Sequence, residues 1–244
     1  MSEHKLKDIE APPHIGFSEQ VAYALVGGNK VIFDIGSRDD DYFSRAEPSN
    51  IVHCFEPNPN FYSNLKEKHK DISNSVLNNF GLGNDNNIYD YFTSSQSIIK
   101  NPWHPGDSIS DFKIQIKRLD SYCNDNNIKV IDFIKTDTEG MDYSILKASY
   151  NKILELSVPY IQFEWWSEGV SNFRNLMANE YDLFFMNSPV YKSFIDSDDM
   201  FIKINDDISN IILHSMNPRG YGGNIFCINK LNRCDGIESI KYYL

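Results

Sequence analysis

The sequence predicts an α/β protein whose mostly parallel β-sheet is covered by helices on both faces. Short apolar runs rich in β-branched residues alternate along the chain with segments whose apolar residues recur at helical spacing. Several of these runs end on a charged residue, which is typical of parallel strands that present their carboxyl ends to a ligand at one edge of a sheet. The chain has 244 residues, a length that fits one domain of this kind.

The first half of the chain contains two expected helices among a series of strands. Residues 17–26 have helical spacing that ends at Gly27-Gly28, and Asn58 with Pro59 forms a typical helix start. Apolar runs predict strands over 30–35, over 51–55, near Val76, over 87–92 and over 112–117. The segment between the last two strands, which includes 101–106 with two prolines, is too long for a simple turn.

The second half continues the alternation. Residues 130–136 form an apolar run, and after Gly140 the apolar positions Ile145, Leu146 and Ala148 predict a helix. We expect further elements in the order strand 159–163, helix 170–178, strand near Leu183 and strand 224–228.

Charge and cysteine content limit the classes of partner. The formal net charge of −11 is spread along the chain and argues against nucleic acid, because phosphate binding needs a basic surface. The four cysteines, Cys54, Cys123, Cys227 and Cys234, lack CxxC spacing and predict neither a zinc site nor a disulfide framework. The N-terminus has no apolar signal core and no apolar stretch is long enough for a bilayer, so we expect a soluble cytoplasmic protein without membrane insertion.

A carboxylate follows the second strand. Glu56 lies 56 − 34 = 22 residues after Asp34, close to the ~20-residue offset at which an acid meets a ribose in nucleotide-binding βαβ units. An acid at this point can accept hydrogen bonds from both ribose hydroxyls. The alternative is that Glu56 is a solvated residue at a strand end and that Pro57 and Pro59 only shape the turn.

The loop after the first strand favours a cofactor without phosphates. A dinucleotide fingerprint needs three spaced glycines, and only Gly36 is present. Asp39 to Asp41 place three carboxylates where the following helix should begin, which would oppose a pyrophosphate, and for Asp39 and Asp41 we favour capping of that helix. S-adenosylmethionine keeps the ribose but carries positive centres instead of phosphates, and Gly36 would let its methionine part approach the backbone.

Charged residues alternate at the end of the predicted strand over 130–136. If the extended conformation continues through Glu139, then Lys135, Asp137 and Glu139 project to the same side, and Gly140 allows the turn into the next helix. Such a cluster at the carboxyl end of a strand is typical of a functional site. A purely structural network of the lysine with the carboxylates is the alternative.

Three blocks of the sequence together resemble the FkbM family of S-adenosylmethionine-dependent methyltransferases. They are VIFDIGSRDDDYFS, VHCFEPNPNF and IKRLDSYCNDNNIKVIDFIKTDTEGMDYSILKAS, which cover roughly half of the chain. The chain departs from the family pattern at Asp40, where many members carry a second glycine. The segments 93–111 and 187–223 have no counterpart that we can place.

The resemblance implies a Rossmann-like class I methyltransferase fold and methylation of a hydroxyl oxygen on a sugar, glycan or small metabolite. It divides the chain into an N-terminal extension and helix (1–29), a cofactor-binding core (30–165) and a C-terminal substrate-side segment with the last strands (166–244). We predict that the residues contacting S-adenosylmethionine are Asp34, Gly36, Ser37, Arg38, Glu56 and Asn58.

Transfer of a methyl group to a hydroxyl requires a base near the methyl. We favour Asp137 for this role, with Glu139 orienting the substrate or sharing the proton and Lys135 holding the carboxylates. His104, in the proline-rich loop beside Trp103, is the rival base. A magnesium ion on Asp137 and Glu139 is a further alternative that we do not adopt, so no metal site is predicted.

Two other classes of protein remain open. A nicotinamide-dependent oxidoreductase would use the same sheet and Glu56, but the missing glycines count against it. A catalytically silent nucleoside-binding protein would keep the fold and lose the base. Near the second half of the sheet, Trp165 is expected either to stack on a sugar ring or to lie in the core, and Tyr221 to Gly223 are expected to form a hinge or a substrate contact.

Overall fold

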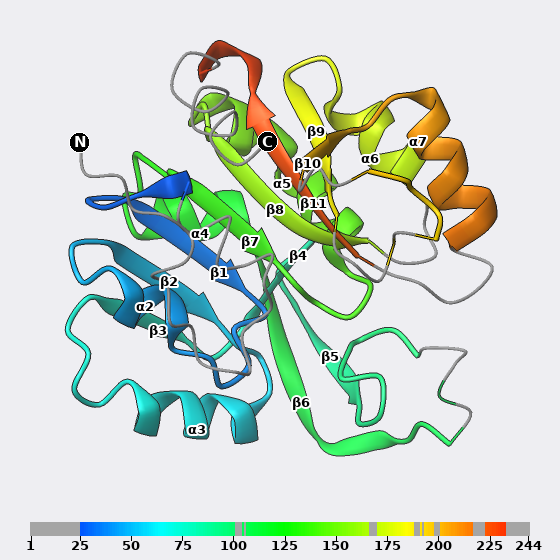
Figure 1. Ribbon diagram of the computed structural model, residues 1–244. Helices are drawn as coiled ribbons and strands as arrows, with labels where there is room; N and C mark the ends of the chain where they lie inside the picture. The colour runs from blue at the N-terminus through cyan, green and yellow to red at the C-terminus, as the bar shows by residue number, and fades with distance from the viewer. Residues whose placement is uncertain are drawn as a thin grey trace.

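The computed structural model describes residues 25–100, 104, 106–165, 170–187, 191, 193–197, 201–216 and 223–232. A large sheet runs through the centre of the molecule, with helices on both sides (Figure 1). Its strands lie in the order β10 (Phe201–Lys203), β9 (Tyr181–Met186), β11 (Gly223–Asn229), β8 (Tyr160–Trp165), β7 (Phe133–Thr136), β1 (Val31–Ile35), β2 (Ile51–Phe55) and β3 (Ser75–Asn78).

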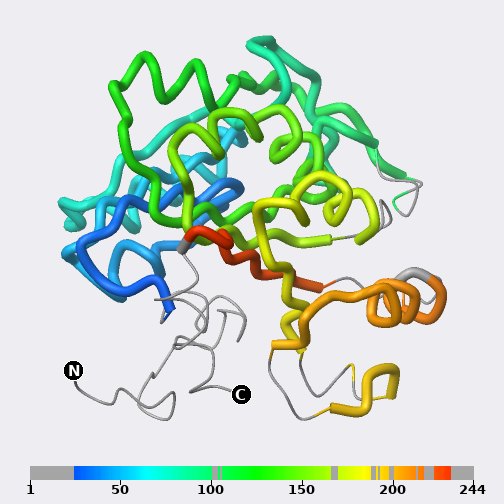
Figure 2. Tube along the Cα trace, turned by 90° about the horizontal axis from the view of Figure 1, so that it is seen from above, coloured from blue at the N-terminus to red at the C-terminus, as the bar shows by residue number. Residues whose placement is uncertain are grey.

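Most of the sheet is parallel. The strands β3, β2, β1, β7 and β8 pair in parallel, whereas β11 is antiparallel to both β8 and β9. The view from above in Figure 2 shows the red C-terminal strand β11 beside the yellow strand β9. The chain order reverses between β1 and β7, so the ligand site expected for an open sheet lies at the carboxyl ends of these two strands.

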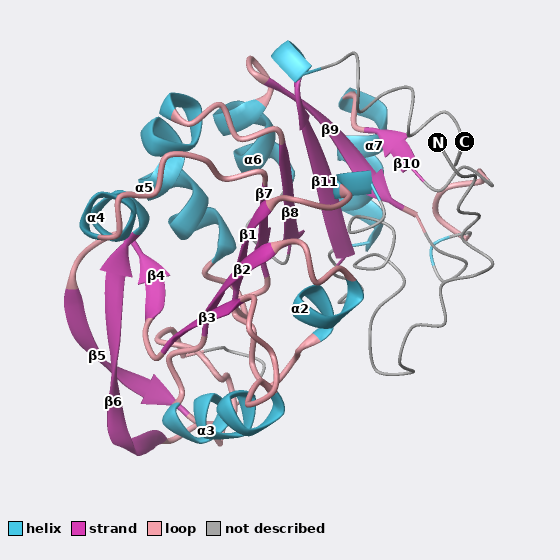
Figure 3. Cartoon of the chain, turned by 90° about the vertical axis from the view of Figure 1, so that its left-hand side faces the viewer, coloured by secondary structure: helices cyan, strands magenta, loops and turns pink. Residues whose placement is uncertain are grey.

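Two helical layers cover the sheet because side chains of each strand alternate between its faces. Phe33 and Ile35 of β1 belong to the cluster packed by α4 (Leu119–Asp125), α5 (Asp142–Glu155) and α6 (Val170–Met177). Ile32 points to the other face, where the cluster includes residues of α2 (Tyr42–Ala46) and α3 (Pro59–Lys68). Figure 3 shows α4, α5 and α6 together on one side of the sheet. The predicted α/β architecture is therefore confirmed.

A second, three-stranded sheet extends from the carboxyl edge of the first. It has the order β4 (Gly81–Gly83), β6 (Ile109–Arg118) and β5 (Asn87–Phe92), and the β5–β6 hairpin projects away from the main sheet (Figure 1). Tyr91, Ile114 and Ile116 form its own small core. This hairpin becomes one wall of the cavity described below.

Most of the predicted elements have counterparts in the structure. Asn58 caps α3, as its side chain accepts hydrogen bonds from the N–H groups of Asn60 (2.9 Å) and Phe61 (3.5 Å). The predicted helix over 17–26 lies outside the described residues except for Leu25 and Val26, which are helical. Trp103, Trp166, Tyr221 and Gly222 also lie outside them.

The structure corrects one strand boundary and the role of one side chain, and it contains several short elements that were not predicted. The strand predicted from residue 130 begins at Phe133, because Asp132 instead binds the start of β1 through its side chain, which accepts from the Val31 N–H at 2.8 Å. Trp165 is fully buried in the core, so the stacking role is wrong for it. The short elements α2, β4, α4, β10 (Phe201–Lys203), α7 (Asp206–Ile211) and the π-helical turn Ile212–Met216 were not predicted, since they are too short to show a periodic pattern.

The ends of β1, β2 and β7 are joined by main-chain contacts around Gly36. The Gly36 N–H donates to the carbonyl of Phe55 at 3.0 Å, and the Asp137 N–H donates to the carbonyl of Ile35 at 3.0 Å. Gly36 has φ +84°, and a β-carbon added there would lie 1.9 Å from the carbonyl oxygen of Asp137. This close approach requires glycine independently of any ligand.

We therefore expect Gly36→Ala to lower the free energy of unfolding by more than about 2 kcal/mol, from the positive φ and the backbone overlap together. Urea unfolding measures this change. Gly106→Ala is the matched control, because a β-carbon at Gly106 meets no atom within 4 Å, and it should change stability by less than about 0.5 kcal/mol. Equal stability of the two variants would contradict the close approach at Gly36.

Candidate active site

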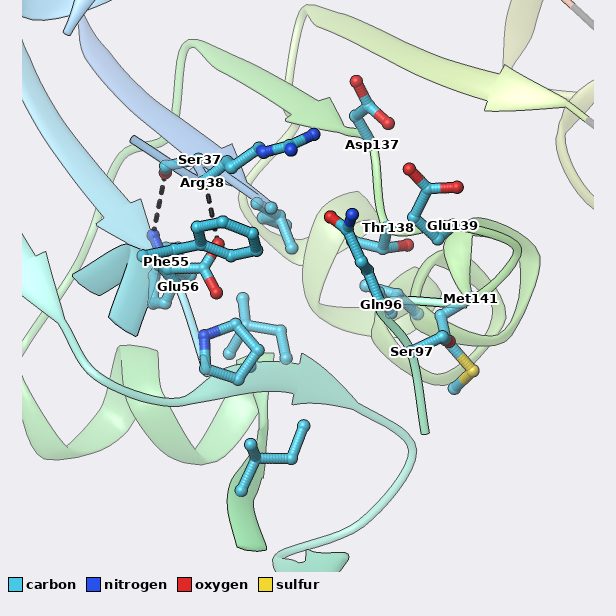
Figure 4. Close-up of a pocket in the computed structure, with 18 of the residues that line it drawn as sticks. Ser37, Arg38, Phe55, Glu56, Gln96, Ser97, Asp137, Thr138, Glu139 and Met141 are labelled. Atoms are coloured by element: carbon cyan, nitrogen blue, oxygen red, sulfur yellow. Dashed lines mark hydrogen bonds between the residues drawn. The ribbon is translucent and has the colours of Figure 1, made fainter. Parts of the chain in front are cut away.

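A cavity of about 440 Å³ lies at the carboxyl ends of β1, β2 and β7. Its size falls in the range typical of small-molecule sites. Its lining includes the loop after β1, the Glu56-Pro57 turn after β2, the turn after β7 and the inner face of the second sheet (Figure 4). The helices α3 and α5 also contribute side chains. The cavity therefore occupies the place at which the strand order reverses.

Glu56 is the acid at the end of β2, and only 5% of the residue is exposed. Its Oε2 accepts a hydrogen bond from the Arg38 N–H at 2.8 Å, and its Oε1 accepts one from the Asn58 N–H at 2.7 Å. Burial raises the pKa of Glu56 to about 7 against the opposing effect of these hydrogen bonds. A carboxylate oxygen has two lone pairs, so each oxygen can accept a further hydroxyl from the cavity. The placement argues against a solvated role.

The first loop is fixed by its own main chain. The N–H groups of Gly36 and Ser37 both donate to the carbonyl of Phe55, at 3.0 and 3.2 Å, and the next N–H, of Arg38, donates to Glu56. Ser37 Oγ donates to the carbonyl of Asp34 at 2.8 Å and accepts from the Phe55 N–H at 3.2 Å. Gly36, Ser37 and Arg38 line the cavity, as predicted for cofactor-binding residues, and their role in binding stays a prediction.

Asp34 and Lys135 form a buried ion pair beneath the cavity. Lys135 Nζ lies 3.4 Å from Asp34 Oδ1 and 3.7 Å from Asp137 Oδ2, and both Lys135 and Asp34 are buried. Burial raises the pKa of Asp34, and the charge of Lys135 opposes the increase. Lys135 lines the cavity, whereas Asp34 lies one layer further in. Lys135 thus connects the ends of two adjacent strands, and this pairing supports the predicted holding role.

The turn after β7 differs from the predicted extended conformation. The strand ends at Thr136, and Glu139 adopts a left-handed conformation with φ 53° before Gly140 at φ 95°. Asp142 at the start of α5 stabilises the turn, since its Oδ2 accepts from the N–H and Oγ1 of Thr138 at 3.3 and 2.9 Å. The simple alternation is therefore wrong, but the turn still places Lys135, Asp137 and Glu139 around the same cavity.

The two carboxylates of this turn have different environments. The side chain of Asp137 is 42% exposed. Burial raises the pKa of Glu139, the charge of Asp137 raises it further, and the charges of Arg38 and His104 oppose the increase. Asp137 and Glu139 extend above Thr138 in Figure 4, and the guanidinium group of Arg38 points toward Asp137. The turn thus brings two carboxylates to the cavity that a bound molecule can reach, since Asp137 is half-buried and Glu139 is exposed.

Asn58 and His104 lie at the margins of the site. Asn58 is buried as the cap of α3 and donates its N–H to Glu56, and it is not among the residues that line the cavity. His104 is exposed, and its carbonyl accepts from the Asp107 N–H at 2.9 Å. His104 is not among the residues that line the cavity. A cofactor contact of Asn58 and a catalytic role of His104 stay predictions.

The three acids after the first loop have roles that differ from those predicted. Asp40 Oδ1 accepts from the Tyr42 N–H at 2.9 Å and so caps α2. Asp41 is the N-cap residue but makes no cap hydrogen bond through its side chain, which pairs with Arg45. Asp39 pairs with Lys68 at 3.0 Å. The capping role predicted for Asp39 and Asp41 therefore belongs to Asp40.

The sequence analysis missed the residues that the second sheet contributes to the cavity. The sheet itself contributes Gly81, Leu82, Tyr91, Ile114 and Ile116, and the loop after β5 contributes Gln96, Ser97 and Ile98. In the sequence, the apolar residues Ile114 and Ile116 alternate with polar residues on the strand. This pattern indicates that one face of the strand is packed, but it does not show that the face lines a cavity.

Two negative findings apply to the described part of the chain. It contains no group of three or more His, Cys, Asp or Glu residues arranged to hold a metal ion. It also contains no helix with the length and apolar character needed to cross a membrane.

The order β3-β2-β1-β7-β8-β11-β9, with β11 antiparallel, and a ligand cavity at the β1–β7 reversal define a Rossmann-like class I methyltransferase fold. A sequence profile described as the methyltransferase FkbM domain matches residues 26–182. The chain belongs to the FkbM methyltransferase family, and the resemblance seen in the sequence is confirmed.

Similar proteins include one curated enzyme and several solved structures. The chain is 20% identical over 163 residues to the 2-O-methyltransferase NoeI of Sinorhizobium fredii (strain NBRC 101917 / NGR234), an overlap of 59% of this chain and 67% of that protein. The methyltransferase FkbM of Methylobacillus flagellatus KT aligns with a TM-score of 0.45 and 12% identity over 82% of this chain and 44% of that chain, so the chain spans less than half of that structure. SMU.1697c of Streptococcus mutans, in complex with SAH, aligns with a TM-score of 0.47 and 9% identity over 87% and 95% of the two chains.

The raised pKa of Glu56 predicts a pH-dependent loss of stability in the protein without ligand. On folding, Glu56 takes up a proton between its ordinary pKa and about 7, so its stabilising contribution is present near pH 5 and is lost as the pH rises through about 7. Glu56→Gln cannot titrate. The stability of the Gln variant relative to the wild type should therefore increase by about 2–3 kcal/mol from pH 5 to pH 8.

Urea unfolding of both proteins at each pH measures this difference. Asp142, whose pKa is raised to about 6 by burial, titrates in both proteins and cancels in the comparison. A difference between the two proteins that is independent of pH would show that Glu56 is ionised in the folded state throughout this range.

Proposed function

We propose that the chain is an S-adenosylmethionine-dependent O-methyltransferase that acts on a hydroxyl of a sugar, glycan or small metabolite. The observation that carries this proposal is the arrangement of carboxylates around one cavity. Glu56 faces it from the end of β2, as expected for a ribose-binding acid, and Asp137 and Glu139 face it from the end of β7. Membership of the FkbM methyltransferase family supports the same conclusion.

The residues of the first loop fit a cofactor without phosphates. A pyrophosphate needs free main-chain N–H groups at this loop. Here the consecutive N–H groups of Gly36, Ser37 and Arg38 are already used by Phe55 and Glu56. The helix that follows, α2, has five residues and acids before it. These features disfavour the nicotinamide-dependent oxidoreductase and support S-adenosylmethionine, whose ribose Glu56 would hold.

The acceptor oxygen needs a base, and the chain offers Asp137. When bound, S-adenosylmethionine supplies a methyl group that passes to the acceptor oxygen and leaves a neutral thioether. Asp137 is accessible in the cavity and can take the proton that the hydroxyl loses. Lys135, 3.7 Å from Asp137 Oδ2, holds the carboxylate in place. Glu139 orients the acceptor or shares the proton. Retention of these groups also disfavours a catalytically silent protein.

Three further observations support the acceptor class and the cellular location. The name of the relative NoeI, a 2-O-methyltransferase, supports an oxygen acceptor. The net charge of −11 argues against a nucleic acid as the acceptor. Cys54, Cys123 and Cys227 are free, buried thiols, which supports a reducing compartment such as the cytoplasm.

Cofactor choice can be tested by thermal denaturation and calorimetry. S-adenosylmethionine or its demethylated product should raise the Tm through mass action on the native state, and NAD should not. At pH 8, where Glu56 is mostly ionised, Glu56→Ala should raise the Kd for S-adenosylmethionine by about tenfold or more, because hydrogen bonds to a charged carboxylate contribute about 1.5–3 kcal/mol each. The control is Glu67→Ala. The side chain of Glu67 is 74% exposed on α3, so its removal should leave the Kd unchanged. Stabilisation by NAD alone would overturn the cofactor assignment, and an unchanged Kd in Glu56→Ala would remove Glu56 from the ribose site.

The base can be identified from single-turnover rates of methyl transfer. Asp137→Asn keeps the size of the side chain but removes proton acceptance, so the rate should drop ~10²–10⁴-fold with little change in the Kd for S-adenosylmethionine. His104→Gln should have a much smaller effect. A larger loss in His104→Gln than in Asp137→Asn would assign the base to His104, and normal turnover of Asp137→Asn would show that Asp137 is not the base.

A further inference from the structure

The loop after β5 closes one side of the cavity and contributes polar side chains to it. Gln96, Ser97 and Ile98 follow β5 and line the cavity together with Asp137, Thr138 and Glu139. In Figure 4 the carboxamide of Gln96 points toward the Thr138–Glu139 turn. Gln96 thus points toward the turn that carries the proposed base.

The backbone holds Gln96 in an uncommon conformation. Gln96 has φ 51°, in the left-handed region that costs a non-glycine residue about 1 kcal/mol or more. Two main-chain hydrogen bonds close the turn around it, from the Phe92 N–H to the Ser97 carbonyl at 2.8 Å and from the Thr93 N–H to the Ser108 carbonyl at 3.0 Å. Strain of this kind persists only where the surroundings determine it, and it is concentrated at functional sites.

Asp107 supplies the third restraint on this turn. Its Oδ1 accepts from the Ser94 N–H at 2.8 Å, and its Oδ2 accepts from the N–H of Ser95 at 3.3 Å and from the Ser95 hydroxyl. Ser95, Ser97 and Asp107 are 2%, 4% and 8% exposed. Because buried polar groups fix the turn on both sides of Gln96, its backbone is already held in place before a molecule binds in the cavity.

The charges around Gln96 select against anions. Asp137 and Glu139 are its acidic neighbours in the cavity. The three cations of the lining each contact another group: Lys135 pairs with Asp34 and Asp137, Lys68 pairs with Asp39, and the Arg38 guanidinium carbon lies 4.8 Å from the centre of the Phe61 ring. A carboxylate accepts hydrogen bonds only, whereas a carboxamide both donates and accepts. This combination suits an uncharged group of neighbouring hydroxyls and repels carboxylates and phosphates.

We propose, on the basis of the methyltransferase function above, that Gln96 is a specificity-determining residue for a neutral acceptor with adjacent hydroxyls. Its carboxamide bonds to a hydroxyl next to the one that is methylated. The turn clamped by Asp107 positions that carboxamide, and Asp137 receives the proton of the reacting hydroxyl.

The acceptor class is tested with a panel and methyl-labelled S-adenosylmethionine. One arm contains methyl glycosides of glucose, galactose, mannose and fucose. The others contain hexuronic acids, hexose phosphates and amino sugars. We expect label in the methyl glycoside arm and little in the charged arms. Label confined to the other arms overturns the proposal but leaves a methyltransferase. Absence of label from every arm also overturns it, and calorimetry of S-adenosylmethionine with the same sample then shows whether the cofactor part of the proposed function stands.

The role of Gln96 is tested with Gln96→Ala on the best methyl glycoside. The KM for the glycoside should rise about three- to tenfold, as for one lost hydrogen bond, while the Kd for S-adenosylmethionine stays unchanged. Saturation-transfer NMR of the same glycoside with the SAH-loaded protein should weaken in parallel, which reports binding without turnover. Gln115→Ala, exposed on β6 of the same hairpin, is the matched control and should change neither quantity. An unchanged KM and NMR signal in Gln96→Ala would overturn the assignment.

Discussion

The carbonyl of Phe55 is the contact on which the whole carboxyl edge of the sheet depends. It accepts hydrogen bonds from the N–H groups of both Gly36 and Ser37, at 3.0 and 3.2 Å. These two bonds hold the sharp turn of the chain at the end of β1. The turn sends the next N–H, of Arg38, to Glu56 and brings Gly36 against the carbonyl of Asp137. Three strand ends are thus positioned by main-chain groups, so the side chains of the site are mounted on a rigid frame.

Charge in the site is organised by depth. The deepest groups, Asp34 and Lys135, neutralise each other beneath the cavity floor. Glu56 is also buried, whereas the turn after β7 carries Asp137, which is half-buried, and Glu139, which is exposed. Breaking a buried pair costs more than the pair contributes, because it leaves one charge unpaired in a low dielectric. Lys135 therefore links the stability of the fold to the position of Asp137, the proposed base.

The sequence could predict the elements that depend on local patterns of apolar residues and on helix-start residues. Long apolar runs placed β1, β2, β8 and β9, and Asn58 with Pro59 located the start of α3. Glu56 and Asp137 were found because acids directly follow such runs. Gln96 could not be found, since its place in the cavity depends on how a hairpin formed by distant residues folds back over the sheet. The turn at Glu139 was also missed, because a left-handed glutamate carries no compositional signal.

The position of β11 has a consequence for the order in which the sheet can be completed. The strands β8 and β9 are joined only through β11, which pairs antiparallel with both. During synthesis, the ribosome releases β8 and β9 well before residues 223–229, and each strand then has an unpaired edge facing the other. An open edge of buried apolar residues is prone to pair with another chain. Nascent chains that stop before residue 223 are therefore expected to be substrates for chaperones, whereas the full chain closes its own sheet.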